Sequence, residues 1–243
     1  MLNITSRVIS WIQEYFEGNP QGKAVIGISG GKDSTVAAGL LCRALGADRV
    51  VCVLMPNGEQ YDIQDSYQVL DCLHIPEENR RCVNIGTMYT AAIAALGYQE
   101  GDAISPVVTT NLPSRLRMSI LYAVAAVYPG ARVVNTCNRS EDYVGYSTKF
   151  GDSAGDFSPL ADLTVREVLE IGDDLGMPEN LVHKAPSDGM CGSTDEMKQG
   201  FTYRELDDFL LGTGTPCQAS MDKIQRLHRI NMHKLLPMPK FTK

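Results

Sequence analysis

The sequence predicts an α/β fold, a doubly wound parallel sheet with helices on both faces and a helical C-terminal segment. Short apolar runs alternate with stretches of helical period between residues 24 and 136. The runs contain few polar residues, which is typical of strands that are buried on both faces. Parallel strands need crossover connections, and the intervening helices supply them.

The elements follow in order along the chain. Val8, Ile9 and Ile12 recur at helical spacing near the amino terminus, and Gly18 ends that helix. The predicted strands are residues 24–29, 49–55, 81–85 and 131–136. The predicted helices are residues 6–15, 34–45, 62–73, 88–96, 112–127, 164–175, 203–211 and 216–235. Two polar loops, residues 29–34 and 137–159, leave the carboxyl ends of strands, where ligands of such sheets bind.

Composition excludes several classes of protein. Hydrophobic residues make up 44% and charged residues 21%, which is ordinary for one globular domain over residues 1–243. The net charge of −7 gives no general attraction to nucleic acid or anionic lipid, although a local basic patch stays open. No apolar run is long enough to cross a membrane, and the amino terminus lacks the pattern of a secretory signal. Seven cysteines without a CxxC pair indicate a reducing compartment, so we expect a cytoplasmic protein.

A glycine-rich loop follows the first predicted strand and opens a helix. Backbone N–H groups at such a position bind phosphate, and a lysine and hydroxyls add donors. A carboxylate in an anion site repels phosphate unless a cation lies between them, so Asp33 points to Mg²⁺. The predicted nucleotide-binding residues of this loop are Gly27, Ile28, Ser29, Gly30, Gly31, Lys32, Asp33 and Ser34.

Other readings of the loop stay open at this point. A Walker A loop fails because Ile26 stands at its first glycine position and Asp33 follows the lysine. A nucleophile elbow GxSxG fits with Ser29 as the nucleophile, and His228 or His233 as its base, which would make a serine hydrolase. A third possibility is a nucleotide-binding module that binds ATP without turnover.

The segment SGGKDS resembles the pyrophosphate-binding loop SGGxDS of ATP pyrophosphatases, and further segments resemble NAD synthetases. The similar segments run in family order from about residue 24 to 239. They are NLPSRLRM at residues 111–118, TCNRSE at 136–141, GYSTKFGD at 145–152 with Asp156, KAPS at 184–187, TDE at 194–196, and His233-Lys234 before Pro237.

The resemblance implies an adenine nucleotide alpha hydrolase-like, Rossmann-like fold and a C–N ligase. The family uses ATP, Mg²⁺, ammonia and nicotinic acid adenine dinucleotide (deamido-NAD), and forms NAD, AMP and pyrophosphate through an adenylated intermediate. Only 23 residues precede the first predicted strand, so we expect no glutaminase domain and the ammonia-dependent form. The family is homodimeric, which implies a homodimer here. Another ATP pyrophosphatase that acts on a different carboxylate is the alternative.

The resemblance also assigns roles to individual residues. Thr136 and Ser187 would join the glycine-rich loop in binding ATP, and Asp33 and Glu141 would ligate Mg²⁺. The implied deamido-NAD contacts are Arg115, Lys149, Asp156, His233 and Lys234. The implied catalytic residues are Asp33, Lys149 and Asp152, of which Asp152 would attract ammonium and take its proton.

Val165 and Asn135 are among the departures from the family pattern. Val165 stands where the family carries a lysine that contacts the phosphates of ATP, and Arg166 follows it. We therefore expect Arg166 to do part of the work of that lysine. Asn135 stands where the family has a glycine before Thr136.

Overall fold

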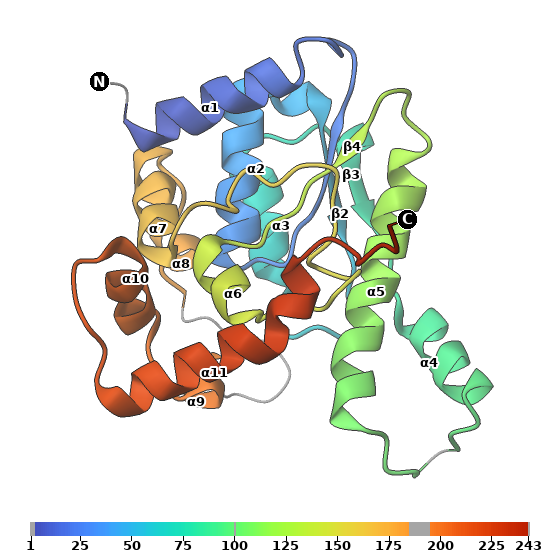
Figure 1. Ribbon diagram of the computed structural model, residues 1–243. Helices are drawn as coiled ribbons and strands as arrows, with labels where there is room; N and C mark the ends of the chain where they lie inside the picture. The colour runs from blue at the N-terminus through green and yellow to red at the C-terminus, as the bar shows by residue number, and fades with distance from the viewer. Residues whose placement is uncertain (1–2, 100, 185–194, 243) are drawn as a thin grey trace.

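A parallel four-stranded sheet with the strand order β3-β2-β1-β4 lies at the centre of the molecule (Figure 1). The computed structural model describes residues 3–99, 101–184 and 195–242. The strands are β1 (Ala24–Gly27), β2 (Val50–Leu54), β3 (Arg80–Cys82) and β4 (Arg132–Val133). All pairings are parallel, with Ala24 beside Val50 and beside Arg132, so the predicted sheet is confirmed.

The predicted helices are present, most with shifted ends. The helices are α1 (Ile4–Tyr15), α2 (Lys32–Leu45), α3 (Ile63–Cys72), α4 (Gly86–Ala95), α5 (Pro106–Ala125), α6 (Arg139–Val144), α7 (Val165–Asp174), α8 (Glu179–Val182), α9 (Asp195–Gln199), α10 (Tyr203–Leu211) and α11 (Gln218–Leu235). Helix α5 starts before the predicted position because Pro106 occupies its first turn, and it continues through the buried Pro113. Helix α6 lies inside residues 137–159, which were expected to form a loop. Helices α8 and α9 lie where no helix was predicted.

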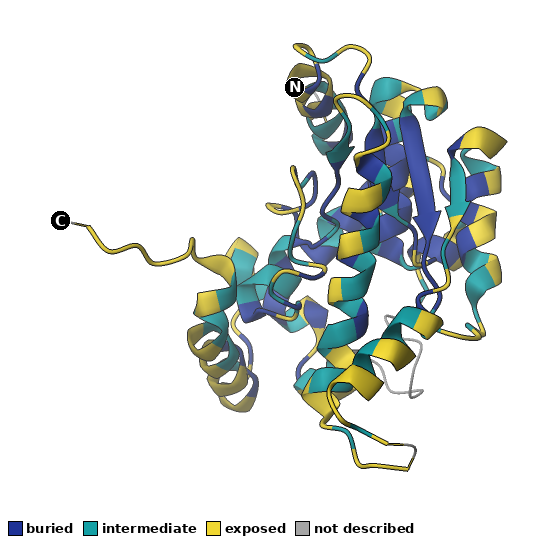
Figure 2. Cartoon of the chain, turned by 90° about the vertical axis from the view of Figure 1, so that its right-hand side faces the viewer, coloured by how far each residue is buried: buried dark blue, intermediate teal, exposed yellow. Residues whose placement is uncertain are grey.

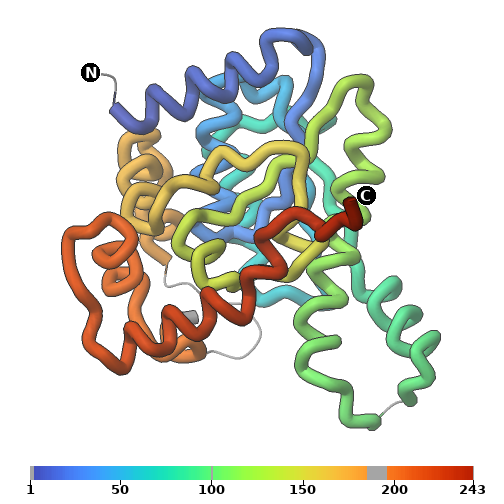
Figure 3. Tube along the Cα trace, in the orientation of Figure 1, coloured from blue at the N-terminus to red at the C-terminus, as the bar shows by residue number. Residues whose placement is uncertain are grey.

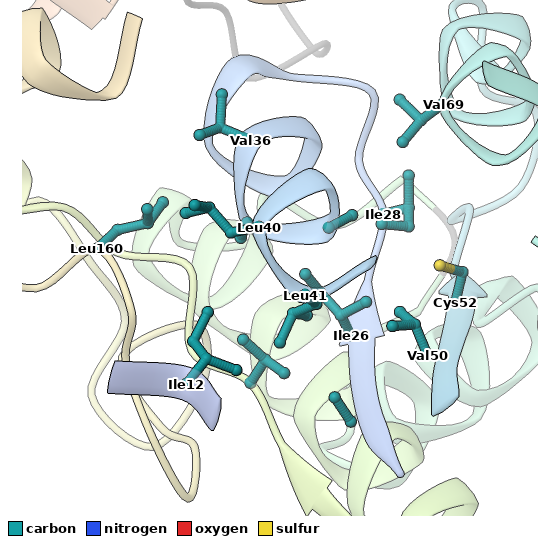
Figure 4. Packing of buried hydrophobic residues seen from close by; sticks show 14 of the residues in the cluster. Ile12, Ile26, Ile28, Val36, Leu40, Leu41, Val50, Cys52, Val69 and Leu160 are labelled. Carbon is teal, nitrogen blue, oxygen red and sulfur yellow. The ribbon is translucent and has the colours of Figure 1, made fainter. Parts of the chain in front are cut away.

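Alternate residues of the strands point to opposite faces of the sheet. Ile26 and Cys52 pack with Leu41 of α2 in the larger core cluster, which also includes α1, α3 and α7 (Figure 4). Val25 and Val51 point the other way and pack against α5. These strand residues are fully buried, and in Figure 2 the dark blue strands lie between helices whose outer surfaces are yellow. The predicted cover of helices on both faces is confirmed.

The C-terminal segment has a small core of its own. Val165 at the start of α7 packs there with Tyr203 and Leu206 of α10 and with Ile224 of α11. Helix α11 also lies along α6, so the red end of the chain in Figure 3 runs beside the yellow-green segment around residue 145. Within the described ranges, none of the helices combines the length and apolarity that a membrane span requires.

The strand order creates a switch point between β1 and β4. The chain moves from β1 through β2 to β3 on one side, and then returns to place β4 on the other side of β1. The segments that follow β1 and β4 therefore diverge at the carboxyl end of the sheet. A crevice at such a point is the usual ligand site of an open parallel sheet.

Candidate functional site

The glycine-rich loop forms a tight turn between β1 and α2. Gly30 has φ +80, and a Cβ there would lie 2.9 Å from the Cβ of Asp65 and 3.0 Å from the backbone N of Ser66. Both the positive φ and the close approach of α3 require glycine at this position. The Ser34 hydroxyl accepts from the Ser29 backbone N–H at 3.2 Å and lies 3.1 Å from the Ser29 hydroxyl. The turn therefore brings two hydroxyls together at the start of α2, where the N–H groups favour an anion.

The two predicted metal ligands meet around one lysine and one asparagine. The buried Lys32 ammonium lies 2.8 Å from an oxygen of Asp33 and 3.8 Å from an oxygen of Glu141. The Asn138 amide donates to the other oxygen of Asp33 at 2.9 Å, and its own oxygen accepts from the Glu141 backbone N–H at 3.0 Å. The structure thus brings the loop after β1 and the start of α6 into one polar cluster.

Helix α6 explains how Glu141 reaches this cluster. Asn138 caps the helix and Glu141, at its third position, returns a bond to the Asn138 backbone N–H at 3.4 Å, which makes a reciprocal capping box. Sequence reasoning missed both the helix and the role of Asn138. The pattern Asn138-x-x-Glu141 was the available signal, because asparagine is a preferred cap and glutamate suits the third position.

Asp152 reaches the same site from the segment after α6. The Ser114 hydroxyl donates to its carboxylate at 2.5 Å, and the Thr148 backbone N–H donates to it at 3.1 Å. A cavity of about 220 Å³ separates Asp152 from the glycine-rich loop. The predicted residues that line this cavity are Ser29, Gly31, Asp33, Ser34, Thr136, Glu141 and Asp152. Cys137 and Tyr146 also line it; they lie within the family-like segments TCNRSE and GYSTKFGD but were not predicted as site residues.

A second cavity, of about 250 Å³, takes two of the predicted deamido-NAD contacts, Asp156 and Lys234. The Asp156 carboxylate accepts from the Val133 backbone N–H at 2.7 Å and from the Tyr122 hydroxyl at 3.2 Å. The Lys234 ammonium donates to the Gly145 carbonyl at 2.7 Å. The two side chains are thus fixed by the end of the sheet and by the end of α6.

The other predicted deamido-NAD contacts form a chain beside these cavities. The Arg115 guanidinium donates to the Lys149 carbonyl at 3.2 Å. The Lys149 ammonium donates in turn to the carbonyl of His233. The structure therefore brings α5, the segment after α6 and the end of α11 together, although these residues are far apart in sequence.

The sequence predicted that Ser187 and Arg166 contact ATP. Ser187 lies outside the described residues. Arg166, expected to replace the family lysine, instead forms an ion pair with Asp208 of α10 at 2.5 Å. The Val165 side chain is apolar and buried in the C-terminal core, so it does not take the place of the family lysine. Within the described loop, Lys32 is the cation that lies between Asp33 and Glu141.

Burial and like charge shift several pKa values around the site. Burial, together with the charge of Asp152, raises the pKa of Asp142 on α6 to about 6. Burial also raises the pKa of the Cys137 thiol well above its usual value, so this thiol is protonated at neutral pH. Burial lowers the pKa of Lys234, while the charge of Asp152 opposes that shift. The carboxylates of Asp33, Glu141 and Asp152 line the first cavity beside the glycine-rich loop, which suits a cation held next to a phosphate.

The geometry does not support Ser29 as a hydrolytic nucleophile. Its hydroxyl lies beside Ser34 and accepts from the Gly31 backbone N–H at 3.3 Å. Among the described residues, no imidazole lies within hydrogen-bonding distance of it. His228 stacks on Tyr143 with ring centroids 4.1 Å apart, and its Nδ1 lies 2.7 Å from the Tyr143 carbonyl oxygen. A nucleophile without an adjacent base lacks the arrangement that activates serine.

The donor set fits Mg²⁺ bound together with a nucleotide. Asp33 and Glu141 are 18% and 15% exposed, and both contact Lys32. No group of three His, Cys, Asp or Glu side chains able to hold a metal occurs among the described residues. Mg²⁺ commonly binds through one or two carboxylates, with water and substrate phosphates as its other ligands. Two carboxylates beside a phosphate loop match that pattern.

Comparison with known proteins gives one consistent family. The NAD synthase family matches residues 4–239. The NH(3)-dependent NAD(+) synthetase of Alkaliphilus metalliredigens is 36% identical, and the match covers 96% of this chain and 95% of that protein. The solved structure of NMN synthetase from Francisella tularensis has a TM-score of 0.86 and 35% identity, and covers 98% of this chain and 97% of that one. The NH3-dependent NAD synthetase of Campylobacter jejuni, solved with nitrate, has a TM-score of 0.77 and 26% identity, with 99% and 98% coverage.

Proposed function

The chain belongs to the NAD synthase family and is a ligase that forms a C–N bond, and from this premise we propose its substrates and the residues that serve the reaction. The enzyme amidates deamido-NAD with ammonia and uses ATP as the co-substrate. The products are NAD, AMP and pyrophosphate. The curated relatives named NH(3)-dependent NAD(+) synthetase support ammonia as the nitrogen donor.

One observation carries this proposal. Asp33, Glu141 and Asp152 come from three separate segments and line one cavity with the phosphate-type loop at the switch point of the sheet. Acyl adenylation brings an anionic carboxylate against the anionic phosphates of ATP. Groups that hold phosphate and a cation beside a further carboxylate are what this chemistry needs.

The first chemical step forms the adenylate. A nicotinate carboxylate oxygen attacks the α-phosphorus of ATP, and the bond between that phosphorus and the bridging oxygen to the β-phosphate breaks. The N–H groups at the start of α2, the Ser29 and Ser34 hydroxyls and Lys32 bind the departing pyrophosphate. When bound at Asp33 and Glu141, Mg²⁺ neutralises negative charge on the phosphates. Thr136 and Ser187 contact the rest of ATP.

The second step forms the amide. Asp152 attracts ammonium to the cavity and accepts one of its protons, which frees the lone pair of ammonia. Ammonia then attacks the carbonyl carbon of the adenylate, AMP leaves with the electron pair of the broken C–O bond, and the nitrogen releases one proton to water to give the neutral amide. Lys149, Arg115, Asp156, His233 and Lys234 place the nicotinate nucleotide.

An assay of NAD formation tests the proposal. The purified protein is supplied with ATP, Mg²⁺ and deamido-NAD, and with either ammonium or glutamine in ammonia-free buffer. We expect stoichiometric NAD, AMP and pyrophosphate with ammonium, and no product above background with glutamine. Equal rates with both donors would refute the assignment of ammonia, and absence of product with both would refute the reaction.

A second substrate is favoured by one comparison. The structure named NMN synthetase has a higher TM-score and identity to this chain than the C. jejuni NAD synthetase structure. Nicotinic acid mononucleotide carries the same carboxylate without the adenylate half. Measuring kcat/KM for both nucleotides in the same assay decides between them. The preferred substrate is the one whose kcat/KM is higher by at least about tenfold, which corresponds to ~1.4 kcal/mol in transition-state binding.

Assembly and compartment complete the proposal. A homodimer is supported by apolar side chains that α5 leaves exposed, among them Val107 and Tyr122. Helix α4 is rich in apolar residues and buries none of them in one chain. The cysteines that the structure describes are free thiols, which suits the reducing cytoplasm.

A further inference from the structure

Asn135 follows β4 and lies between the two cavities. Its side chain is buried, at 7% exposure, and it lines the second cavity. The next two residues, Thr136 and Cys137, line the first cavity together with Asp152. An uncharged amide at this boundary has no place among the roles proposed above.

The amide of Asn135 uses its full hydrogen-bonding capacity. Its Nδ2 donates to the carbonyl of Asp152 at 2.7 Å and to the carbonyl of Ala154 at 3.1 Å. Its Oδ1 accepts from the backbone N–H of Cys137 at 2.9 Å and from the Ser158 hydroxyl at 2.9 Å. A primary amide offers two donors and two acceptor positions, so no capacity is left over for a ligand.

These bonds join the end of β4 to the main chain of Asp152. Asp152 is also bonded through its backbone N–H and carboxylate to Ser114, and through its carboxylate to the Thr148 N–H. Asn135 supplies the bond on the carbonyl side, and within the described part of the chain the one further donor to that carbonyl is the weak Cys137 thiol at 3.4 Å. Because Asp152 itself is exposed, packing alone does not fix it.

We infer that Asn135 is a positioning residue, which fixes the Asp152 carboxylate opposite the glycine-rich loop through the Asp152 and Ala154 carbonyls. This inference rests on the proposed function, since it assigns to Asp152 the attraction and deprotonation of ammonium. Asn135 does not touch the reacting atoms. A glycine at this position would offer no side-chain donor to these carbonyls.

The experiment compares two buried asparagines that bond in the same manner. Asn79, at the amino end of the sheet, is 1% exposed and donates to the carbonyls of Ala47 and Asp48 at 3.3 and 2.9 Å. Asn135→Ala and Asn79→Ala each remove an amide that serves two carbonyls. Asn135→Asp keeps the size and the acceptor oxygen of the side chain but removes its donors. Two quantities are measured for each variant: amide hydrogen exchange of peptides over residues 148–156, and kcat and KM for ammonium and for ATP.

We expect both Asn135 variants to exchange faster over residues 148–156, while Asn79→Ala does not. We expect kcat/KM for ammonium to fall about 10- to 100-fold in the Asn135 variants, because a small displacement of a reacting group has effects of this order. The KM for ATP stays within about twofold, since the glycine-rich loop does not contact Asn135. Asn79→Ala lowers stability and leaves all these kinetic constants near those of the parent.

Three outcomes would overturn the inference. The first is unchanged amide exchange over residues 148–156 in Asn135→Asp. The second is a kcat/KM for ammonium within about threefold of the parent in the Asn135 variants. The third is an equal change in the KM values of ammonium and ATP in these variants. If Asn135→Ala does not fold, Asn135→Asp carries the test. If the parent enzyme itself forms no amide product, the proposed function fails, and the exchange measurement still decides whether Asn135 orders the segment.

Discussion

At the scale of single residues, the site depends on how one lysine and two carboxylates share a small volume. Lys32 is 6% exposed and lies between Asp33 and Glu141. A buried ammonium needs charged partners, because burial without them is unfavourable. A cation bound with the nucleotide would compete with Lys32 for the same oxygens. We therefore expect Lys32 to contact phosphate when ATP and Mg²⁺ are present, which keeps its charge compensated.

Removing either carboxylate tests the metal site. Asp33→Asn and Glu141→Gln should each reduce turnover by about 100-fold, since one such electrostatic interaction in a transition state contributes roughly 3 kcal/mol. Glu14→Gln, at an exposed position on α1, is the matched control and should leave turnover unchanged. Turnover measured at saturating substrate checks the prediction. Values within a few-fold of the parent in a folded variant would remove that residue from the metal site.

Asn138 gives a second test at this scale, because it has two functions at once. Asn138→Ala removes the cap of α6 and the bond to Asp33. We expect the free energy of unfolding to fall by about 1 kcal/mol from the lost cap, and turnover to fall as Asp33 loses its orientation. Thr202→Ala, which removes the equivalent cap of α10, is the control. Urea unfolding and turnover of both variants check the result, and equal turnover in both would contradict a role for Asn138 in the site.

At the scale of elements, α11 completes the end of α6. His228, Asn231 and Lys234 lie three residues apart on α11, so they share one face. Asn231 donates to the Val144 carbonyl at 2.9 Å, and Lys234 to the carbonyls of Gly145 and Ser147. The last carbonyls of a helix have no partner within it, and these side chains supply one. Lys234, assigned to the substrate from the sequence pattern, thus also has a structural contact.

The packing of α6 against α11 predicts a large effect at Gly145. This residue has φ +65, and a Cβ there would overlap the side chain of Asn231. Gly176, with φ +70 and nothing near its Cβ position, is the matched control. Gly176→Ala should lower the free energy of unfolding by about 1–2 kcal/mol through the left-handed backbone alone. Gly145→Ala should lower it by more, since overpacking adds about 1–3 kcal/mol. Denaturant unfolding measures the free energy of unfolding of both variants. Equal losses would show that α11 moves away from the new Cβ without loss of stability, which would contradict the prediction.

At the scale of the whole molecule, the apolar surface of α4 and α5 calls for a partner. Helix α4 and the start of α5 project at the lower right of Figure 1, and Val107 at the start of α5 is 65% exposed. A second copy of the chain, as proposed, would bury them. The site lies at the carboxyl ends of β1 and β4, at the switch point of the sheet.

The proposed homodimer predicts a defined mass in solution. Sedimentation velocity at micromolar concentration should give a species of twice the chain mass of 26.6 kDa. Val107→Lys on α5, where the side chain is 65% exposed, should shift the protein toward the monomer without unfolding it. Charge in the centre of an apolar interface is unfavourable because it loses water without gaining a partner. A parent that sediments as a monomer throughout would contradict the proposal.

Local sequence pattern was enough to predict the four strands, eight of the helices, the phosphate-type loop and the residue types of the site. Apolar runs and helical spacing depend on local pattern, which a single chain displays directly. It also determined that Asp33 follows a strand and opens a helix, because the glycines of residues 27–31 mark that turn. Helix α6 was not predicted because it is only 6 residues long. Its sequence signal is a capping box and not a helical spacing of apolar residues.

Which side chains meet depends on how the elements pack in the fold. Asn138 and Asp33 are 105 residues apart, and they bond because the strand order places β1 beside β4. Asn135 reaches the carbonyl of Asp152 because the chain folds back after α6, where Phe157 forms a bridge to Val134. Arg166 could have served ATP by its position in sequence, yet it pairs with Asp208 because α7 packs on α10. Partners across such distances are fixed by how layers pack, and local pattern carries no record of that packing.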